Sequence, residues 1–180
     1  MLTITVPAIE MWDESKEEFV SAKEQVLFLE HSLVSLSKWE RKWHKSFLFT
    51  KEKTNEEAID YIRCMTLNSD VDQDVYSRLT RSNFDEINKY MENPMTATTF
   101  RNVNSGGRNS EIVTAELIYY WMISLGIPYE CREWHLNQLI TLIRLCSIKN
   151  SPNKKMSRRE IMSQNAALNA ARRQQFNSKG

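Results

Sequence analysis

Apolar and polar positions alternate at the start of the chain. In residues 2–6, leucine, isoleucine and valine alternate with threonine, the period-two pattern of a half-buried strand, and Pro7 interrupts it. Two further short apolar runs, Ile9–Trp12 and Val26–Leu29, lie on either side of a polar segment. The pattern predicts a small N-terminal β element within about residues 1–30.

After residue 31 the apolar period changes from two to three or four, which is typical of amphipathic helices. Ser32 is a candidate cap for the first helix. Thr54, with Glu57 three residues later, forms a capping box that opens the second. The predicted helices in this part of the chain are one that begins after Ser32 and those at Asn55–Thr66, Val71–Leu79 and Phe84–Met91.

The densest apolar sequence follows a predicted loop at residues 95–109. One helix is predicted from Ile112 to Leu125, after the candidate cap Ser110, and it is apolar almost all round. A second is predicted at Arg132–Ser147. The short joint between them contains Gly and Pro, which makes the two an antiparallel hairpin. We expect this hairpin to form the core of the fold.

The net charge of +1 is unevenly distributed along the chain. Residues 149–180 contain eight Lys or Arg and one acid, a charge of +7, which leaves −6 for residues 1–148. Ser157 and Glu160 form a capping box that opens a helix to about Arg173. The sequence therefore predicts a mostly helical acidic body, 1–148, and a basic linker with a C-terminal helix, 149–180.

Composition favours a mostly helical protein. Four glycines and four prolines in 180 residues are few turn residues for an all-β fold. We expect a mainly α (α+β) fold, with a helical domain, a small N-terminal β element and a basic C-terminal helix. Three cysteines, the absence of a secretory signal pattern and the lack of a long uncharged apolar run favour a reduced cytoplasmic protein without a membrane segment.

The sequence contains no recognisable catalytic or metal-binding motif. It has no His-Glu-x-x-His, no Cys-x-x-Cys and no Gly-x-Ser-x-Gly. Cys131 and His135 are the best metal-like pair, one helical turn apart, but a metal site would need two more ligands from elsewhere. We expect a non-enzymatic protein without a metal or a cofactor.

Two features of the sequence are candidates for contact with a partner. Trp39 and Trp43 lie one helical turn apart among basic residues and could stack nucleic-acid bases, but their apolar stripe favours a core or a protein-binding groove. The basic tail could bind phosphates, dock on the acidic body or be captured by another protein, and the near-neutral chain argues against a dedicated DNA-binding protein. Besides the two tryptophans, the candidate partner-binding residues are Lys154, Lys155, Arg158, Arg159, Arg172 and Arg173.

Four stretches spread over most of the chain carry a resemblance to a known family. They are LEHSLVSLSKWE at 29–40, PMTATTF at 94–100, TAELIYYWM at 114–122 and MSRREI at 156–161. These stretches resemble the tail assembly chaperones of tailed bacteriophages. The resemblance implies a helper protein in the cytoplasm of the infected bacterial host. Such a helper binds the long, apolar-helical tape measure protein, keeps it soluble and helps tail-tube protein to polymerise around it.

Two other classes of function stay open. A structural tail or head-tail protein would be found stoichiometrically in purified virions, whereas a chaperone would not. A nucleic-acid-binding regulator would bind through the basic tail, with an affinity that falls steeply with salt. The sequence leaves the oligomeric state open, with self-association as one option.

Overall fold

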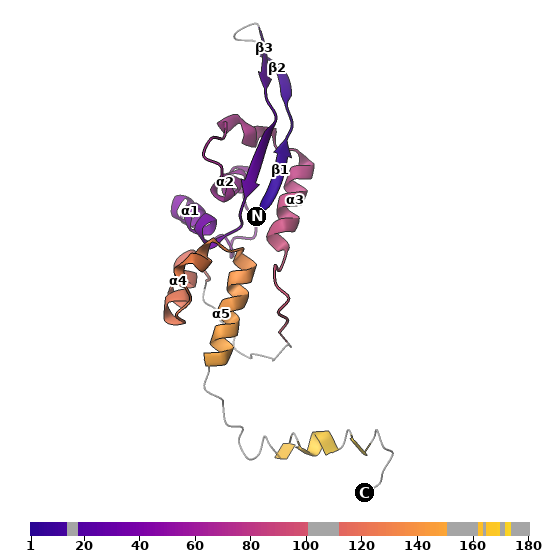
Figure 1. Cartoon of the computed structure of the whole chain (residues 1–180), viewed down its shortest axis with the longest axis vertical. Helices are drawn as coiled ribbons and strands as arrows, with labels where there is room; N and C mark the ends of the chain where they lie inside the picture. Colours follow the sequence, from indigo (N-terminus) through magenta and orange to yellow (C-terminus); the bar gives the residue numbers. More distant parts are fainter. Residues whose placement is uncertain (14–17, 101–111, 151–161, 164, 170–171, 174–180) are drawn as a thin grey trace. The chain divides into compact units, whose positions relative to one another are not determined.

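The computed structural model describes residues 1–13, 18–100, 112–150, 162–163, 165–169 and 172–173 (Figure 1). The chain divides into two compact units, Met1–Cys146 and Ser147–Gly180. Helices predominate in the described residues, and the named strands lie within the first 29 positions. The predicted mainly α (α+β) fold class with a small N-terminal β element is confirmed.

The β element is a two-stranded ribbon in two halves (Figure 1). β1 (Leu2–Val6) pairs antiparallel with β4 (Gln25–Leu29), and β2 (Ile9–Asp13) pairs antiparallel with β3 (Glu18–Ala22), in one continuous register. The three predicted apolar runs form β1, β2 and β4. The sequence did not predict β3, because its apolar run is only two residues long, Phe19 and Val20.

The two halves of the ribbon meet at Pro7, which has no N–H to donate to a neighbouring strand. There, Nη1 of Arg78 donates hydrogen bonds to the carbonyl oxygens of Pro7 (2.9 Å) and Lys23 (3.1 Å). Pro7 lies between β1 and β2, and Lys23 lies between β3 and β4. Arg78 ends η1 (Gln73–Arg78), a 3₁₀ helix that replaces the predicted helix Val71–Leu79. A distant side chain therefore satisfies the carbonyls where strand pairing is interrupted.

The next three helices, α1 (Leu33–Trp43), α2 (Asn55–Met65) and α3 (Arg81–Glu92), each begin with a capping box. The cap residues are Ser32, Thr54 and Thr80, and their partners three positions later are Ser35, Glu57 and Asn83. The first two starts agree with the prediction. α3 begins three residues earlier than predicted. The sequence did not indicate this start, because the capping box has Asn83 in place of the usual Glu or Gln.

α4 (Ala115–Ser124), in contrast, begins three residues later than its predicted start at Ile112, and the hydroxyl of Thr114 caps it. The predicted cap, Ser110, lies outside the described residues. Gly126, with a φ of 66°, follows the end of the helix in the left-handed region, as its place in the sequence predicts.

α5 (Leu136–Asn150) begins four residues after its predicted start at Arg132. The preceding residues, Tyr129–Glu133, form a separate 3₁₀ helix, η2, which follows a proline. α5 buries Leu136, Leu139 and Ile143, so only one side of this helix belongs to the core.

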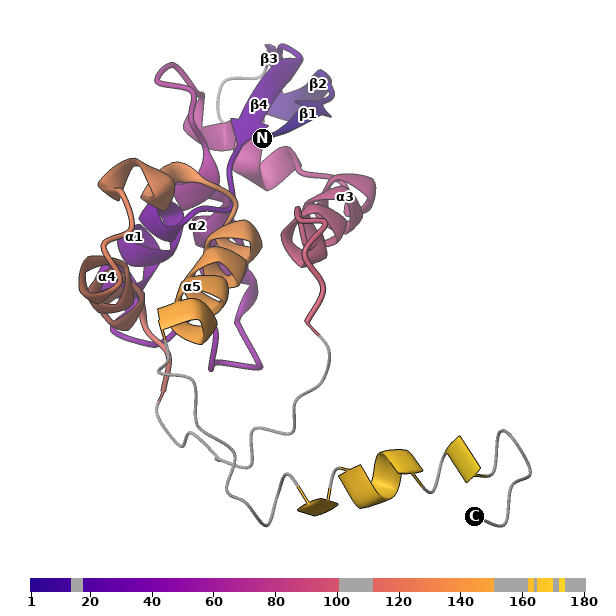
Figure 2. The same cartoon turned by 60° about the horizontal axis from the view of Figure 1, so that its bottom comes forward.

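The core of the first unit is centred on α1, against which α2, α4 and η2 pack, while α3 packs against β1 (Figure 2). α4 buries one side, but Tyr120 and Ile123 on its other side are 63% and 78% exposed. The hairpin of α4 and α5 contributes Ile118, Met122, Leu136 and Leu139 to the core but does not form it alone, so the prediction that it is the core is confirmed only in part. The largest fully buried side chains are Trp39, Ile4, Leu27, Leu29, Leu33, Leu36, Met65, Ile87, Ile118, Met122, Leu136 and Leu139.

The second unit contains the end of α5 and the described residues 162–163, 165–169 and 172–173, which are helical. These positions agree with the helix predicted from Ser157 to about Arg173. Every one of them is exposed, including Met162 and Leu168, so none contributes a buried side chain to the unit.

Candidate protein-binding groove

The two tryptophans of α1 have different environments. Trp39 is fully buried, its Nε1 donates to the carbonyl oxygen of Glu57 (2.8 Å), and its ring meets Phe47 edge to face at a centroid distance of 5.1 Å. Trp43 is half-buried, and its Nε1 donates to Oδ2 of Asp60 (2.9 Å). Trp39 is therefore a core residue and presents no surface to a partner, contrary to its selection as a candidate partner-binding residue.

Two of the basic residues around these tryptophans, Lys42 and Lys45, are paired with α2. Nζ of Lys42 lies 2.5 Å from Oδ1 of Asp60, and Nζ of Lys45 lies 2.6 Å from Oε1 of Glu57. The hydrogen bond from Lys45 holds the pKa of the Glu57 carboxyl below its usual range. The basic-aromatic pattern therefore belongs to the contact between α1 and α2, and its paired lysines are poorly suited to bind phosphates.

The basic tail residues have no common site in the described structure. Arg172 and Arg173 are exposed helical residues of the second unit. The other four candidates, Lys154, Lys155, Arg158 and Arg159, lie outside the described residues. Their role in partner binding stays a prediction.

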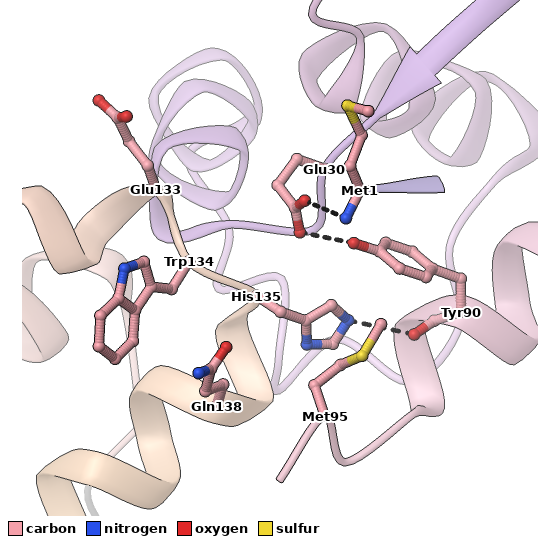
Figure 3. Close-up of a pocket in the computed structure, with 8 residues that line it drawn as sticks. All are labelled: Met1, Glu30, Tyr90, Met95, Glu133, Trp134, His135 and Gln138. Atoms are coloured by element: carbon pink, nitrogen blue, oxygen red, sulfur yellow. Dashed lines mark hydrogen bonds and ion pairs between the residues drawn. The ribbon is translucent and has the colours of Figure 1, made fainter. Parts of the chain in front are cut away.

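A pocket of about 360 Å³ lies at the base of the ribbon, and Figure 3 shows the residues that line it. Its lining residues are Met1, Glu30, Tyr90, Met95, Glu133, Trp134, His135 and Gln138. Both carboxylate oxygens of Glu30 are occupied: Oε2 pairs with the Met1 ammonium at 2.7 Å, and Oε1 accepts a hydrogen bond from the Tyr90 hydroxyl at 2.6 Å. Burial and the neighbouring carboxylate raise the pKa of Tyr90, so this hydroxyl remains a donor.

Two buried histidines continue this network. His135 donates from Nε2 to the carbonyl oxygen of Tyr90 (3.1 Å) and accepts at Nδ1 from the Asn137 N–H (3.3 Å), an assignment that requires the neutral ring. His31 lies beside it, with ring centroids 5.2 Å apart, and its Nδ1 shares a hydrogen bond with the Tyr61 hydroxyl (2.6 Å). Each of these polar groups already has an internal partner, which favours a structural role over acid–base chemistry.

The Cys131–His135 pair does not form a metal site. Cys131 is buried in the middle of η2, and both ring nitrogens of His135 are engaged as described. Within the described ranges, no three His, Cys, Asp or Glu residues are grouped as metal ligands would be.

The buried histidines should make stability depend on pH. Burial, together with the charge that His135 would carry, lowers the pKa of His31 from 6.5 to about 3, and burial also lowers that of His135. Below pH 6.5 the unfolded chain therefore binds protons that the folded chain does not, so stability falls as pH falls. We expect the His31 contribution to decrease by about 2 to 3 kcal/mol between pH 6.5 and 4.5.

The His31→Asn variant provides the measurement, because an amide oxygen can accept from Tyr61 without titrating. Urea unfolding at pH 6.5 and 4.5 should show a smaller loss of stability for His31→Asn than for the unchanged chain. His44→Asn is the matched control, since His44 is exposed and its φ of 53° suits Asn. An equal loss in all three proteins would contradict the assignment.

A different, mostly apolar hollow lies between the facing sides of α2 and α3, and we call it the α2–α3 groove. It consists of two adjoining pockets of about 210 and 340 Å³ that share Ala58 and Phe84. α2 packs mainly against α1 and α3 against β1, which leaves the space between these two helices open. The groove is lined by Phe47, Lys53, Asn55, Ala58, Ile59, Tyr61, Ile62, Phe84, Ile87, Asn88 and Met91.

One wall of the groove is positioned by a buried carboxylate. Glu40 of α1 accepts the N–H of Phe47 at Oε1 (2.8 Å) and that of Ala115 at Oε2 (2.7 Å). Burial raises the pKa of this carboxyl, while the two N–H donors oppose the shift. Phe47 then stacks on Tyr61 with ring centroids 3.8 Å apart. The residues at this wall therefore have fixed positions.

The opposite wall is more adaptable. Phe84 and Met91 of α3 are only half-buried, although both face the groove. Methionine and aromatic side chains accommodate varied apolar surfaces, and a groove between two helices suits the apolar face of a third helix. The sequence placed Phe84, Ile87 and Met91 on one helical face but gave no sign that a space lies in front of it.

The exposed side of α4 is a second apolar surface, with Tyr120 and Ile123 at its centre. It is the convex side of a single helix, and neither Tyr120 nor Ile123 lines the pocket of Figure 3 or the α2–α3 groove. A convex face offers fewer simultaneous contacts to a partner helix than a groove does, so the α2–α3 groove is the better candidate binding site.

Comparisons with known proteins leave the chain without an assigned family. No protein-family model, curated protein or solved structure matches it significantly. In the part of the chain that the structure describes, no helix is long and apolar enough to span a bilayer.

Proposed function

We propose that this protein is a tail assembly chaperone of a tailed bacteriophage. It acts in the cytoplasm of the infected host without catalysing a reaction. Its substrate is a helical segment of the tape measure protein, whose apolar face lies in the α2–α3 groove until tail-tube protein assembles around it. Release of that segment then frees the chaperone.

The α2–α3 groove is the observation that supports this proposal. Its lining is mostly apolar, and its polar members contribute no catalytic arrangement. The hydroxyl of Tyr61, for example, is directed to His31 and is unavailable to a ligand. A surface of this kind recognises apolar shape with little dependence on sequence, which suits a chaperone for a long, repetitive helical protein.

The identity of the partner comes from the resemblance of four sequence stretches to tail assembly chaperones. One of these stretches, Leu29–Glu40, contains most of α1 and ends at the glutamate that positions Phe47. Another, Thr114–Met122, forms the capped start of α4, where the same glutamate binds Ala115. The resembling segments therefore include residues that support a wall of the groove.

Co-expression with the tape measure protein tests the proposal. The full chain should increase the soluble fraction of the tape measure protein and co-purify with it. Mass spectrometry should find the protein in infected-cell lysate and not in purified virions. A stoichiometric amount in virions would identify a structural tail or head-tail protein instead. No gain in solubility, combined with salt-sensitive duplex binding, would identify a nucleic-acid-binding regulator.

A further inference from the structure

Lys53 is the one cation that lines the α2–α3 groove within the described structure. It is half-buried, its Nζ lies 4.1 Å from the centre of the Phe47 ring, and it donates a hydrogen bond to the carbonyl oxygen of Thr50 (2.7 Å). These two contacts hold the ammonium group at the wall of an otherwise apolar groove. Neither contact provides the N–H donors of the ammonium group with an anionic acceptor.

The charge of Lys53 has no carboxylate partner among the described residues. Glu57 is the acid whose charge affects it most, but one oxygen of Glu57 pairs with Lys45 and the other accepts the Thr54 N–H. Burial accordingly lowers the pKa of Lys53 below its usual range, because a partly desolvated ammonium without a counter-ion is disfavoured. An occupant that brought a carboxylate would remove this penalty.

We propose that the α2–α3 groove selects helices that carry an Asp or Glu at the border of their apolar face, and that Lys53 binds this carboxylate. This inference depends on the proposed function, since it specifies which helices the groove accepts. The apolar stripe of the occupant fills the space between α2 and α3. The acidic side chain fixes the register of the occupant and the direction in which it lies.

The partner chemistry follows from the geometry. A helix places residues three and four positions apart on neighbouring edges of one face, so a single acid can reach Lys53 while the apolar residues stay in the groove. A partly desolvated ion pair discriminates better than an exposed one, because water competes less for either charge. A basic residue at the same position would be repelled.

Synthetic helices provide the test with the full chain. A set of peptides of about 18 residues has leucines at i, i+3, i+4 and i+7 and one Glu, placed at a different border position in each peptide. Every peptide has a partner in which Gln replaces Glu. We expect the Glu form to bind about fivefold to tenfold more tightly than the Gln form at one or two neighbouring positions, by calorimetry or fluorescence anisotropy.

Three variants identify the residue responsible. Lys53→Met should remove the preference for Glu and bind the Gln peptides at least as tightly as before, whereas Lys53→Arg should keep the preference. Lys51→Met is the matched control, because Lys51 is exposed, lies in the same segment and does not line the groove. It removes the same charge and should leave the preference unchanged.

The outcomes separate this inference from the proposed function. Equal binding of every Glu and Gln pair, or an unchanged preference in Lys53→Met, would overturn the role of Lys53 and leave the groove as a binding site. Absence of binding by every peptide would overturn both the role of Lys53 and the groove as a helix-binding site.

Discussion

Replacing Ala58 by glutamate will abolish binding of the helical partner without unfolding the protein. Ala58 lines both pockets of the α2–α3 groove, so a longer, charged side chain there occupies the space and carries a carboxylate into a mostly apolar site. We expect the affinity for the tape measure protein to fall at least about 100-fold, a loss on the order of 3 kcal/mol. The soluble yield of that protein in co-expression should fall to the level seen without the chaperone.

The fold should tolerate this change. Ala58 is only half-buried, and glutamate is nearly as good a helix former as alanine, so the free energy of unfolding should change by less than about 1 kcal/mol. Ser124→Glu is the matched control, since it adds the same charge to an exposed position of α4. If Ser124→Glu abolished binding and Ala58→Glu did not, the apolar side of α4 would be the binding surface.

Trp39→Ala will destabilise the protein far more than Trp43→Ala. Trp39 is fully buried and donates to a backbone carbonyl of α2, so its removal should lower the free energy of unfolding by about 3 to 5 kcal/mol. Trp43 is half-buried and donates to a carboxylate that also pairs with Lys42. Its removal should cost about 1 to 2 kcal/mol. Urea unfolding followed by circular dichroism measures both values.

The same pair of variants separates stability from binding. Trp43→Ala should retain partner binding, because Trp43 does not line the α2–α3 groove. Similar losses of stability in the two variants would show that α1 is packed differently. A selective loss of binding in Trp43→Ala, with stability unchanged, would restore Trp43 as a contact residue.

The parts of the fold that depend on nearby residues could be predicted from the sequence. Period-two alternation identified β1, and the capping box of Thr54 and Glu57 fixed the start of α2, because each signal needs only residues a few positions apart. The start of α3 was missed because Asn83 replaces the usual Glu or Gln of the capping box. The closure of the ribbon by Arg78 joins residues 71 and 55 positions apart in the chain, so no local pattern indicates it.

Burial was harder to predict than helix formation. α4 has the most apolar helical sequence, yet Tyr120 and Ile123 are exposed, because only one side of the helix meets α1. Hydrophobicity around a helix indicates which sides could be buried, but neighbouring elements determine which sides are. For that reason the hairpin of α4 and α5 forms only part of the core, whereas the sequence predicted that it forms the core.

The candidate site was only partly visible in the sequence. The tryptophans and lysines of α1 suggested a binding patch, but Glu57 and Asp60 from α2 pair with that patch and make it an internal contact. The α2–α3 groove forms because α2 packs on α1 and α3 packs on β1, and its wall at Phe47 depends on a carboxylate from α1. These relations arise only when distant segments fold together.

Amide hydrogen exchange of the full chain, alone and in complex with the tape measure protein, tests whether the α2–α3 groove is the binding site. We expect slower exchange in the complex at Asn55–Met65 and Arg81–Glu92, the two helices that form the groove, with Ala115–Ser124 unchanged. Slower exchange at Ala115–Ser124 with no change in α2 and α3 would contradict it.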